Sequence, residues 1–128
     1  MRPIPEKPTI AILGGAGEMG RTAVAIISQF EQIGELIVAD ANEEEAKAVV
    51  SQHLENSKTQ MRAQFVDVTD SHQLHSFISG VTIVLNTVGP FYKFGVDVLK
   101  SAIACGCHYV DICDDWEPTI DMMKLDAK

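Results

Sequence analysis

The chain has 128 residues, of which 46% are hydrophobic and 22% are charged, enough apolar material for the core of one globular domain. Its formal net charge of −8 would repel nucleic acid and anionic membrane surfaces, so neither is an expected partner. No apolar run approaches the roughly 20 residues that a bilayer span requires, and the first residues lack the apolar segment of a secretory signal, which together predict a cytoplasmic protein.

The first third of the chain predicts two strands and two helices. A strand over Thr9–Leu13 is followed by apolar residues at helical spacing, namely Met19, Ala23, Ile26, Ile27 and Phe30. Gly34 is expected to end this helix before a second strand over Glu35–Ala39. Asn42 is the expected N-cap of the next helix, whose first turn is acidic and whose predicted buried stripe is Ala46, Val49, Val50 and Leu54.

The middle of the chain continues the alternation. A third strand is predicted over Met61–Val66. Asp70 with Gln73 resembles a capping box, and it opens a short helix that Gly80 ends. The next run, Val81–Asn86, is nearly all apolar and predicts a strand buried on both faces.

The last third predicts a turn, two helices and a strand. Gly89 and Pro90 form the turn, and the apolar stripe of the following helix is Val96, Leu99, Ala102 and Ile103. Gly106 is expected to end that helix before a fifth strand over His108–Ile112. Pro118 suits the first position of a last helix, with Ile120 and Met123 on one face.

Strands that alternate with helices predict right-handed βαβ units and an α/β fold. We therefore expect a Rossmann-type, doubly wound parallel sheet of about five strands in the order 3-2-1-4-5, with helices on both faces. The expected ligand crevice lies at the carboxyl ends of the first and fourth strands.

The clearest motif is a glycine-rich turn between the first strand and the first helix. Gly15, Gly17 and Gly20 spell G-x-G-x-x-G, the spacing that lets a backbone wrap a dinucleotide pyrophosphate. In this interpretation Gly15 makes the tight turn, Gly17 admits the phosphates and Gly20 lets the helix pack closely. Ala16, Glu18 and Met19 complete the predicted site, because the N–H groups at the start of this helix point at the anion.

Asp40 ends the second predicted strand, 20 residues after Gly20. A dinucleotide-binding domain places an acid there to accept hydrogen bonds from the adenosine ribose, which we favour over an ordinary strand-end aspartate. A carboxylate at this point would repel a 2′-phosphate, and residues 41–46 contain no Arg or Lys to pair with one. The sequence therefore favours NAD over NADP as cofactor.

Two further strand ends complete the predicted crevice. Asp67 and Val68 follow the third strand, where they would either contact the adenine or belong to a plain turn. Asn86 ends the fourth strand on the nicotinamide side, and Gly89 and Pro90 follow it at a point where a close approach is expected. Near the other end of the site, Arg21 lies either close to the pyrophosphate or simply in solvent.

The metal-ligating residue types do not form a metal-site pattern. The three cysteines, Cys105, Cys107 and Cys113, are an odd set typical of reduced thiols, and C-x-C is not the spacing of common zinc sites. His72 and His75 are expected to be exposed helix residues. The acidic residues after the fifth strand fit a site at the nicotinamide end and a solvated loop equally well; they are Asp111, Asp114, Asp115 and Glu117.

Taken together, the segments resemble the N-terminal domain of the saccharopine dehydrogenase (saccharopine reductase-like) family. The resemblance covers residues 9 to about 120, and its most specific parts are Gly-Pro-Phe-Tyr at 89–92 and His-Tyr-Val-Asp at 108–111. It implies an NAD(P)-linked oxidoreductase of amino acid metabolism that catalyses reductive amination or its reverse on a small amino-acid-derived substrate. It further implies that Gly15, Gly17, Gly20 and Asp40 hold the cofactor and that Asp111 is a candidate near the catalytic centre.

Members of that family are much longer than this chain, with a second domain that supplies most of the substrate pocket. Residues 1–128 are therefore expected to form one dinucleotide-binding domain of a longer two-domain enzyme, inactive alone because a hydride donor and an imine must be held in register. One alternative is a non-catalytic NAD-binding regulatory or sensor module. Another is a short-chain reductase or epimerase, which requires a lysine four residues after a catalytic tyrosine. In this chain Val96 stands four residues after Tyr92, and Cys113 stands four residues after Tyr109. An unpaired edge on the fifth strand would also allow a homodimer.

Overall fold

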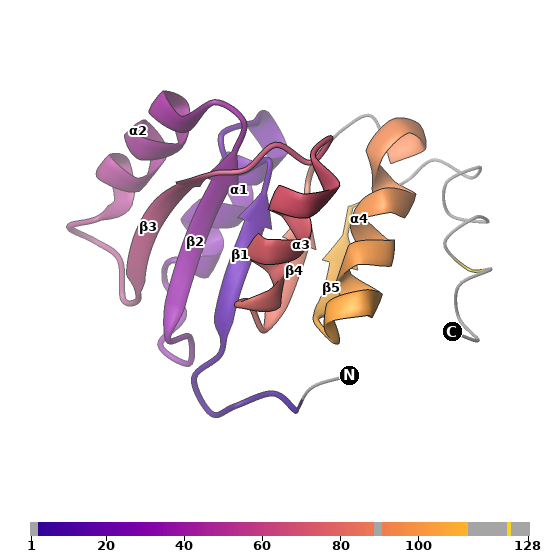
Figure 1. Cartoon of the computed structure of the whole chain (residues 1–128). Coiled ribbons are helices and arrows are strands. Elements are labelled where there is room, and N and C mark those ends of the chain that lie inside the picture. The colour runs from indigo at the N-terminus through magenta and orange to yellow at the C-terminus, as the bar shows by residue number, and fades with distance from the viewer. Residues whose placement is uncertain (1–2, 89–90, 113–122, 124–128) are drawn as a thin grey trace.

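The computed structural model of the chain describes residues 3–88, 91–112 and 123. They form a five-stranded parallel sheet in the order β3-β2-β1-β4-β5, with helices on both faces (Figure 1). The strands are β1 (Thr9–Leu13), β2 (Glu35–Asp40), β3 (Gln60–Phe65), β4 (Ile83–Asn86) and β5 (His108–Asp111). The helices are α1 (Glu18–Ile27), α2 (Glu43–His53), α3 (Ser71–Ser79) and α4 (Phe91–Cys105). The predicted Rossmann-type fold and its strand order are confirmed.

The central strand β1 brings the loops of the site together. It pairs in parallel with β2 on one side and β4 on the other, and its last residue, Leu13, is level with Ala39 and Asn86. Because parallel strands end at the same edge of a sheet, the loops after β1, β2 and β4 meet there. The strand order reverses direction between β1 and β4, so this edge is the topological switch point at which ligands bind in such sheets.

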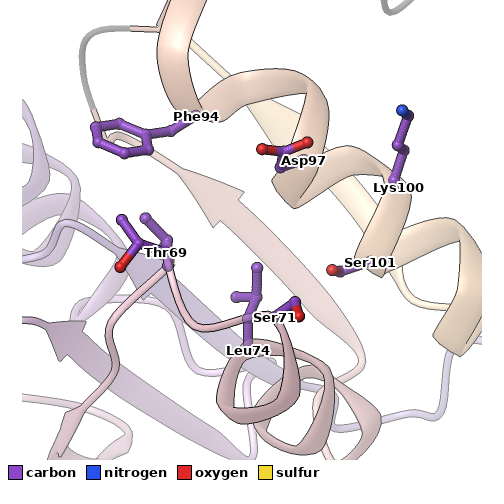
Figure 2. A pocket seen from close by; sticks show the side chains of 8 residues that line it. Thr69, Ser71, Leu74, Phe94, Asp97, Lys100 and Ser101 are labelled. Carbon is purple, nitrogen blue, oxygen red and sulfur yellow. The ribbon is translucent and has the colours of Figure 1, made fainter.

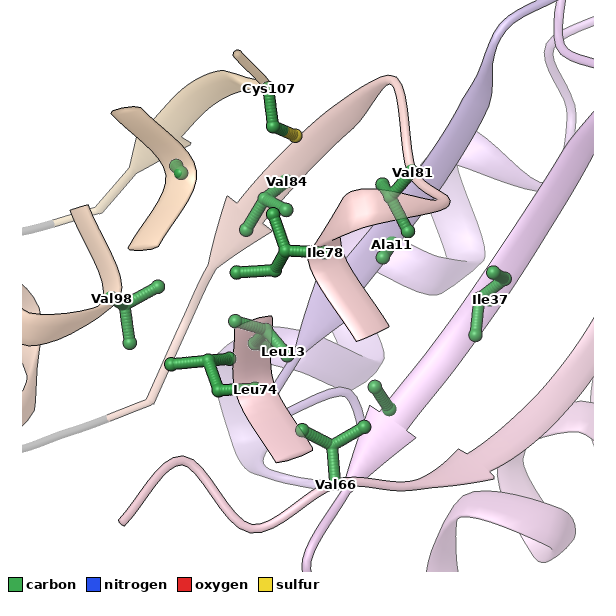
Figure 3. Packing of buried hydrophobic residues seen from close by; sticks show 12 residues of the cluster. Ala11, Leu13, Ile37, Val66, Leu74, Ile78, Val81, Val84, Val98 and Cys107 are labelled. Carbon is green, nitrogen blue, oxygen red and sulfur yellow. The ribbon is translucent and has the colours of Figure 1, made fainter. Parts of the chain in front are cut away.

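Two hydrophobic clusters, one on each face of the sheet, hold the helices in place. On one face Leu13, Ile37 and Val84 of the strands pack with Leu74 and Ile78 of α3 and with residues of α4 (Figure 3). On the other face Ile12, Leu36 and Val38 pack with Val24 of α1 and with Ala46 and Val49 of α2. Burial on both faces explains why the central strands are almost continuously apolar in sequence.

The first helix differs from its prediction. It ends at Ile27, where the Ser28 hydroxyl donates to the carbonyl oxygen of Ala25, rather than continuing to Phe30. Met19, Ile26 and Phe30 of the predicted stripe are 55%, 58% and 45% exposed. Ala23 and Ile27 of the stripe do pack against the core as partly buried residues, but the fully buried residues of the helix are Gly20 and Val24, and a glycine adds no hydrophobic signal to a periodicity count.

The predicted caps of the next two helices are present, with one change of partner. Asn42 accepts from the N–H of Glu45 at 3.2 Å, and Asp70 accepts from the N–H groups of His72 and Gln73. The side chain of Gln73 accepts from the N–H of Asp67 at 2.7 Å rather than from Asp70, as a reciprocal box would require. The reason is that the Asp70 N–H already donates to the carbonyl oxygen of Asp67.

Several predicted boundaries shift by one or two residues. The third strand is Gln60–Phe65, the fourth begins at Ile83, and the fifth ends at Asp111. The last predicted helix lies outside the described residues except for Met123, which is exposed. Among the helices that the structure describes, none combines the length and apolar character that crossing a membrane requires.

Candidate functional site

The glycine turn after β1 is fastened to the end of β2. The N–H groups of Gly14 and Gly15 both donate to the carbonyl oxygen of Ala39, at 2.9 and 3.1 Å. Gly14 has a φ of +78°, in the left-handed region that favours glycine. Gly15 lies in this turn, which spans residues 14–16, but the residue with the left-handed backbone is Gly14. Gly15 is instead constrained by space, because a Cβ there would lie 2.6 Å from Cγ1 of Val38.

The last glycine of the motif lets α1 pack directly on this turn. A Cβ at Gly20 would overlap the carbonyl oxygen of Gly14 and lie 2.7 Å from the Cα of Gly15. Both obstacles are backbone atoms that cannot rotate away. The close packing fixes where the start of α1 points relative to the turn.

Gly17, between them, is the N-cap of α1 and has no side chain to accept a hydrogen bond from the first turn. This leaves the start of α1 without the side-chain cap that Asn42 gives α2 and Asp70 gives α3. Among the described residues, a Cβ at Gly17 would meet one heavy atom within 4 Å, the carbonyl oxygen of Gly14 at 3.3 Å. Glu18 and Met19 follow as exposed first-turn residues.

Thr87, which sequence reasoning did not single out, ties β4 to the glycine turn. Its hydroxyl donates to the carbonyl oxygen of Leu13 at 2.7 Å and lies 3.1 Å from that of Gly14, while its N–H also donates to Leu13. A Cβ at Gly14 would lie 2.9 Å from this hydroxyl oxygen. The turn is thus held from β2 on one side and from β4 on the other.

Asp40 lies at the end of β2 and holds two backbone segments at once. One carboxylate oxygen accepts from the N–H of Ala16 at 3.1 Å, and the other accepts from the N–H of Asn42 at 2.9 Å. The hydrogen bond from Ala16 joins the glycine turn to Asp40, the acid that the sequence predicts to bind the ribose. A carboxylate can accept about four hydrogen bonds, so these two use about half of its capacity.

Arg21 brings a positive charge to the same place. Its Nε donates to the carbonyl oxygen of Ala16 at 2.7 Å, and its Nη2 donates to Oε2 of Glu45 at 2.6 Å. The sequence placed Arg21 either near the pyrophosphate or in solvent, and it did not predict that this side chain reaches from α1 to Glu45 after β2. The one available signal was its position directly after the last glycine.

A groove of about 390 Å³ follows these loops along the carboxyl edge of the sheet. It brings together four of the predicted residues, Gly17, Asp40, Asp67 and Val68. Its remaining lining residues are Leu13, Gly14, Ala39, Ala41, Val66, Thr69, Thr87, Val88 and Phe94. Of these, Phe94 comes from α4.

Asp67 is held in a tight local turn at one end of this groove. Its Oδ1 accepts from the hydroxyl of Thr69 at 2.6 Å and from the Thr69 N–H at 2.9 Å. These bonds, the hydroxyl first, stabilise the charged form and hold the pKa of Asp67 below its ordinary value. A charged carboxylate therefore faces the groove at neutral pH.

Asn86 and Asp111 are level with each other in the paired strands β4 and β5, and Tyr109 connects them. The amide of Asn86 donates to the hydroxyl oxygen of Tyr109 at 3.2 Å, and that hydroxyl donates to Asp111 at 2.7 Å. Asn86 also accepts from the N–H of Val88 at 3.0 Å. Because Asn86 is completely buried, it is placed to hold the 86–88 loop rather than to present its amide at the surface.

A second cavity, of about 520 Å³, adjoins the groove beyond Thr69 and Phe94. Figure 2 shows it between the start of α3 and the side of α4, with Ser71, Asp97 and Ser101 around it. The predicted turn residues Gly89 and Pro90 lie outside the described residues. So do Cys113, Asp114, Asp115 and Glu117.

The histidines and cysteines gather no metal site within the described part of the chain, where no three ligating residues come together. Cys105 and His75 do meet, with 3.4 Å between Sγ and Nδ1, where α4 crosses α3. Cys107 is buried, with Sγ 3.4 Å from the carbonyl oxygen of Thr82.

Comparison with known proteins adds the family. The model of the saccharopine dehydrogenase NADP-binding domain matches residues 10–125. A curated protein of Caenorhabditis elegans, the lipid droplet localized protein, is 27% identical over 108 residues, which are 80% of this chain and 25% of that protein.

Solved structures agree in fold. Apo saccharopine dehydrogenase (L-Glu forming) from Saccharomyces cerevisiae matches with a TM-score of 0.73 and 22% identity, over 92% of this chain and 24% of that one. A short-chain type dehydrogenase/reductase from Mycobacterium ulcerans matches with a TM-score of 0.65 and 12% identity, over 85% of this chain and 52% of that one. The chain spans about a quarter of the length of the worm relative and of the yeast enzyme.

Proposed function

Since the chain belongs to the saccharopine dehydrogenase NADP-binding domain family, and is thus an NAD(P)-binding domain, we propose that it holds the dinucleotide along the groove at the carboxyl edge of its sheet. The observation that carries this proposal is the hydrogen bond between Asp40 and the N–H of Ala16. This bond holds the acid proposed for the ribose directly beside the glycine turn proposed for the pyrophosphate.

In this proposal the pyrophosphate lies over Gly17, at the start of α1. The residues assigned to it are Gly15, Ala16, Gly17, Glu18, Met19 and Gly20. Gly17 admits a close approach, and the first-turn N–H groups of α1 favour an anion because the helix dipole is positive at this end. No side chain of the N-cap competes for those N–H groups.

The adenosine ribose is assigned to Asp40. Its carboxylate has about two acceptor positions beyond its bonds to Ala16 and Asn42, which is enough for the two ribose hydroxyls. The same charge disfavours a 2′-phosphate, so we propose a preference for NAD although the family is described as NADP-binding. The adenine is assigned to Asp67 and Val68, which line the same groove.

The nicotinamide half is assigned to the end of β4. Gly89 and Pro90 are proposed to line it, and buried Asn86 acts by holding the preceding loop. When bound, the nicotinamide would supply or accept the hydride of a reductive amination or its reverse. Asp111, oriented by the hydroxyl of Tyr109, is the proposed polar group nearest that end.

We further propose that residues 1–128 are one domain of a longer, cytoplasmic two-domain enzyme. Its second domain would provide most of the pocket for an amino-acid-derived substrate. Cofactor binding, rather than turnover, is the activity proposed for the chain alone, because one half of the site cannot hold both reactants in register.

The test is calorimetric titration of the chain with NADH and with NADPH. We expect NADH to bind more tightly than NADPH, and we expect Asp40→Ala to reduce the difference between the two affinities. Glu31→Gln is a matched charge control, because Glu31 lies in the loop before β2, at the opposite edge of the sheet. Failure of both nucleotides to bind would overturn the proposed function, whereas equal affinities in the unmodified chain would overturn only the argument from Asp40.

A further inference from the structure

We propose that Arg21 is the group that would bind a 2′-phosphate and that its ion pair with Glu45 keeps it from doing so. This ion pair would then determine how strongly the site discriminates between NADH and NADPH. The inference rests on the proposed function, because it concerns the ribose end of the same groove. It assigns a specificity role to two residues on different helices, α1 and α2, neither of which lines the groove itself.

The first step is distance. The peptide groups of Ala16 connect the acid and the cation, since its N–H donates to Asp40 and its carbonyl oxygen accepts from Nε of Arg21. The backbone N and O atoms of one residue are at most about 3.6 Å apart, so Asp40 Oδ2 and Arg21 Nε are less than about 9.5 Å from each other. Arg21 is therefore close enough to the ribose position proposed at Asp40 for its long side chain to reach a phosphate on O2′.

The second step is charge. The guanidinium of Arg21 is already neutralised by Glu45, with 2.6 Å between Nη2 and Oε2. The neighbouring acids at the start of α2 have a different partner, since Lys47 lies 3.2 Å from Glu43 and 3.8 Å from Glu44. Of these three glutamates, Glu45 is therefore the one paired with Arg21. A 2′-phosphate at the ribose would therefore lie near two carboxylates, those of Asp40 and Glu45, and near a guanidinium that is already paired.

The third step is the strength of the pair. The side chains of Arg21 and Glu45 are 45% and 50% exposed, and ion pairs at that exposure are weak. Arginine binds phosphate as it binds carboxylate, through two parallel N–H groups, so Glu45 and a 2′-phosphate compete for the same guanidinium. Removal of the Glu45 carboxylate would therefore leave the guanidinium of Arg21 available to bind a phosphate beside the ribose.

The experiment measures the ratio of NADPH to NADH affinity at low salt in four chains: the unmodified one, Glu45→Gln, Glu44→Gln and the double variant Arg21→Met/Glu45→Gln. Glu44→Gln removes the same charge one position away without touching Arg21. We expect Glu45→Gln to raise the ratio by up to about five-fold over Glu44→Gln, which is the factor that releasing an exposed ion pair of about 1 kcal/mol gives. In the double variant this gain should disappear. Adenosine 2′,5′-bisphosphate against AMP repeats the comparison with the ribose phosphate alone.

An equal rise in Glu45→Gln and Glu44→Gln would overturn the inference in favour of general charge repulsion. A rise that persists without Arg21 would overturn it as well. Both results presuppose that NADH binds the unmodified chain, so they are distinct from a failure of the proposed function. Thermal unfolding of each variant checks that the substitutions, all at exposed side chains, leave the fold intact.

Discussion

Substitution of Gly20 by alanine should weaken the fold through one defined steric conflict. The new Cβ would lie 2.7 Å from the Cα of Gly15 and overlap the carbonyl oxygen of Gly14. Non-bonded carbon atoms prefer about 3.5 to 4.0 Å, so α1 would have to move by about 1 Å from the turn it packs on. Because both obstacles are backbone, no side-chain rotation relieves the overlap.

The magnitude follows from two opposing terms. Overpacking of this kind costs up to about 3 kcal/mol, and alanine recovers about 1 kcal/mol over glycine inside a helix. The expected net loss of unfolding free energy for Gly20→Ala is therefore about 2 kcal/mol. For a domain of this size that corresponds to a decrease in Tm of roughly 6 to 10 °C.

Thermal and urea unfolding followed by circular dichroism measure the effect. Gly80→Ala is the matched control: Gly80 has a φ of −97°, and among the described residues a Cβ there would meet one atom, the carbonyl oxygen of Phe77 at 3.9 Å. Its Tm should stay the same or rise slightly, since alanine restricts the unfolded chain. A Gly20→Ala variant as stable as the unmodified chain, or a Gly80→Ala variant equally destabilised, would refute the argument from close packing.

Two further predictions concern local hydrogen bonds near α3. Asp70→Ala removes the acceptor for the N–H groups of His72 and Gln73 and should lower the unfolding free energy by about 1 kcal/mol in denaturant titrations. Asp70→Asn keeps an acceptor oxygen and should retain most of this stability. Equal losses in the two variants would contradict the capping role. Thr69→Val removes the hydroxyl that chiefly depresses the pKa of Asp67, so a carboxyl-detected NMR titration should show that pKa rising toward its ordinary value. A depressed pKa contributes stability that is present above the ordinary pKa and lost as pH falls through the folded value, so the variant should depend less on pH in that acidic range; an unchanged pKa would contradict the assignment.

The candidate site was predictable where it depended on position along the chain. The glycine spacing and the 20 residues between Gly20 and Asp40 placed the turn and the acid at neighbouring strand ends, and the structure brings Gly17, Asp40, Asp67 and Val68 to one groove. The contribution of α4 was not predictable, because Phe94 lies far along the chain and only the crossover from β4 brings it over the groove.

The sequence by itself determined the order of strands and helices, since hydrophobic periodicity and the glycine and cap residues report on each element alone. What the tertiary structure decided were the contacts between elements: the left-handed turn at Gly14 beneath Thr87, the burial of Asn86, and the ion pair between Arg21 and Glu45. The physical reason is that such contacts join segments 20 to 80 residues apart. Periodicity shows which face of an element is buried, but only the packed sheet determines which hydrogen-bond and charge partners meet at its edge.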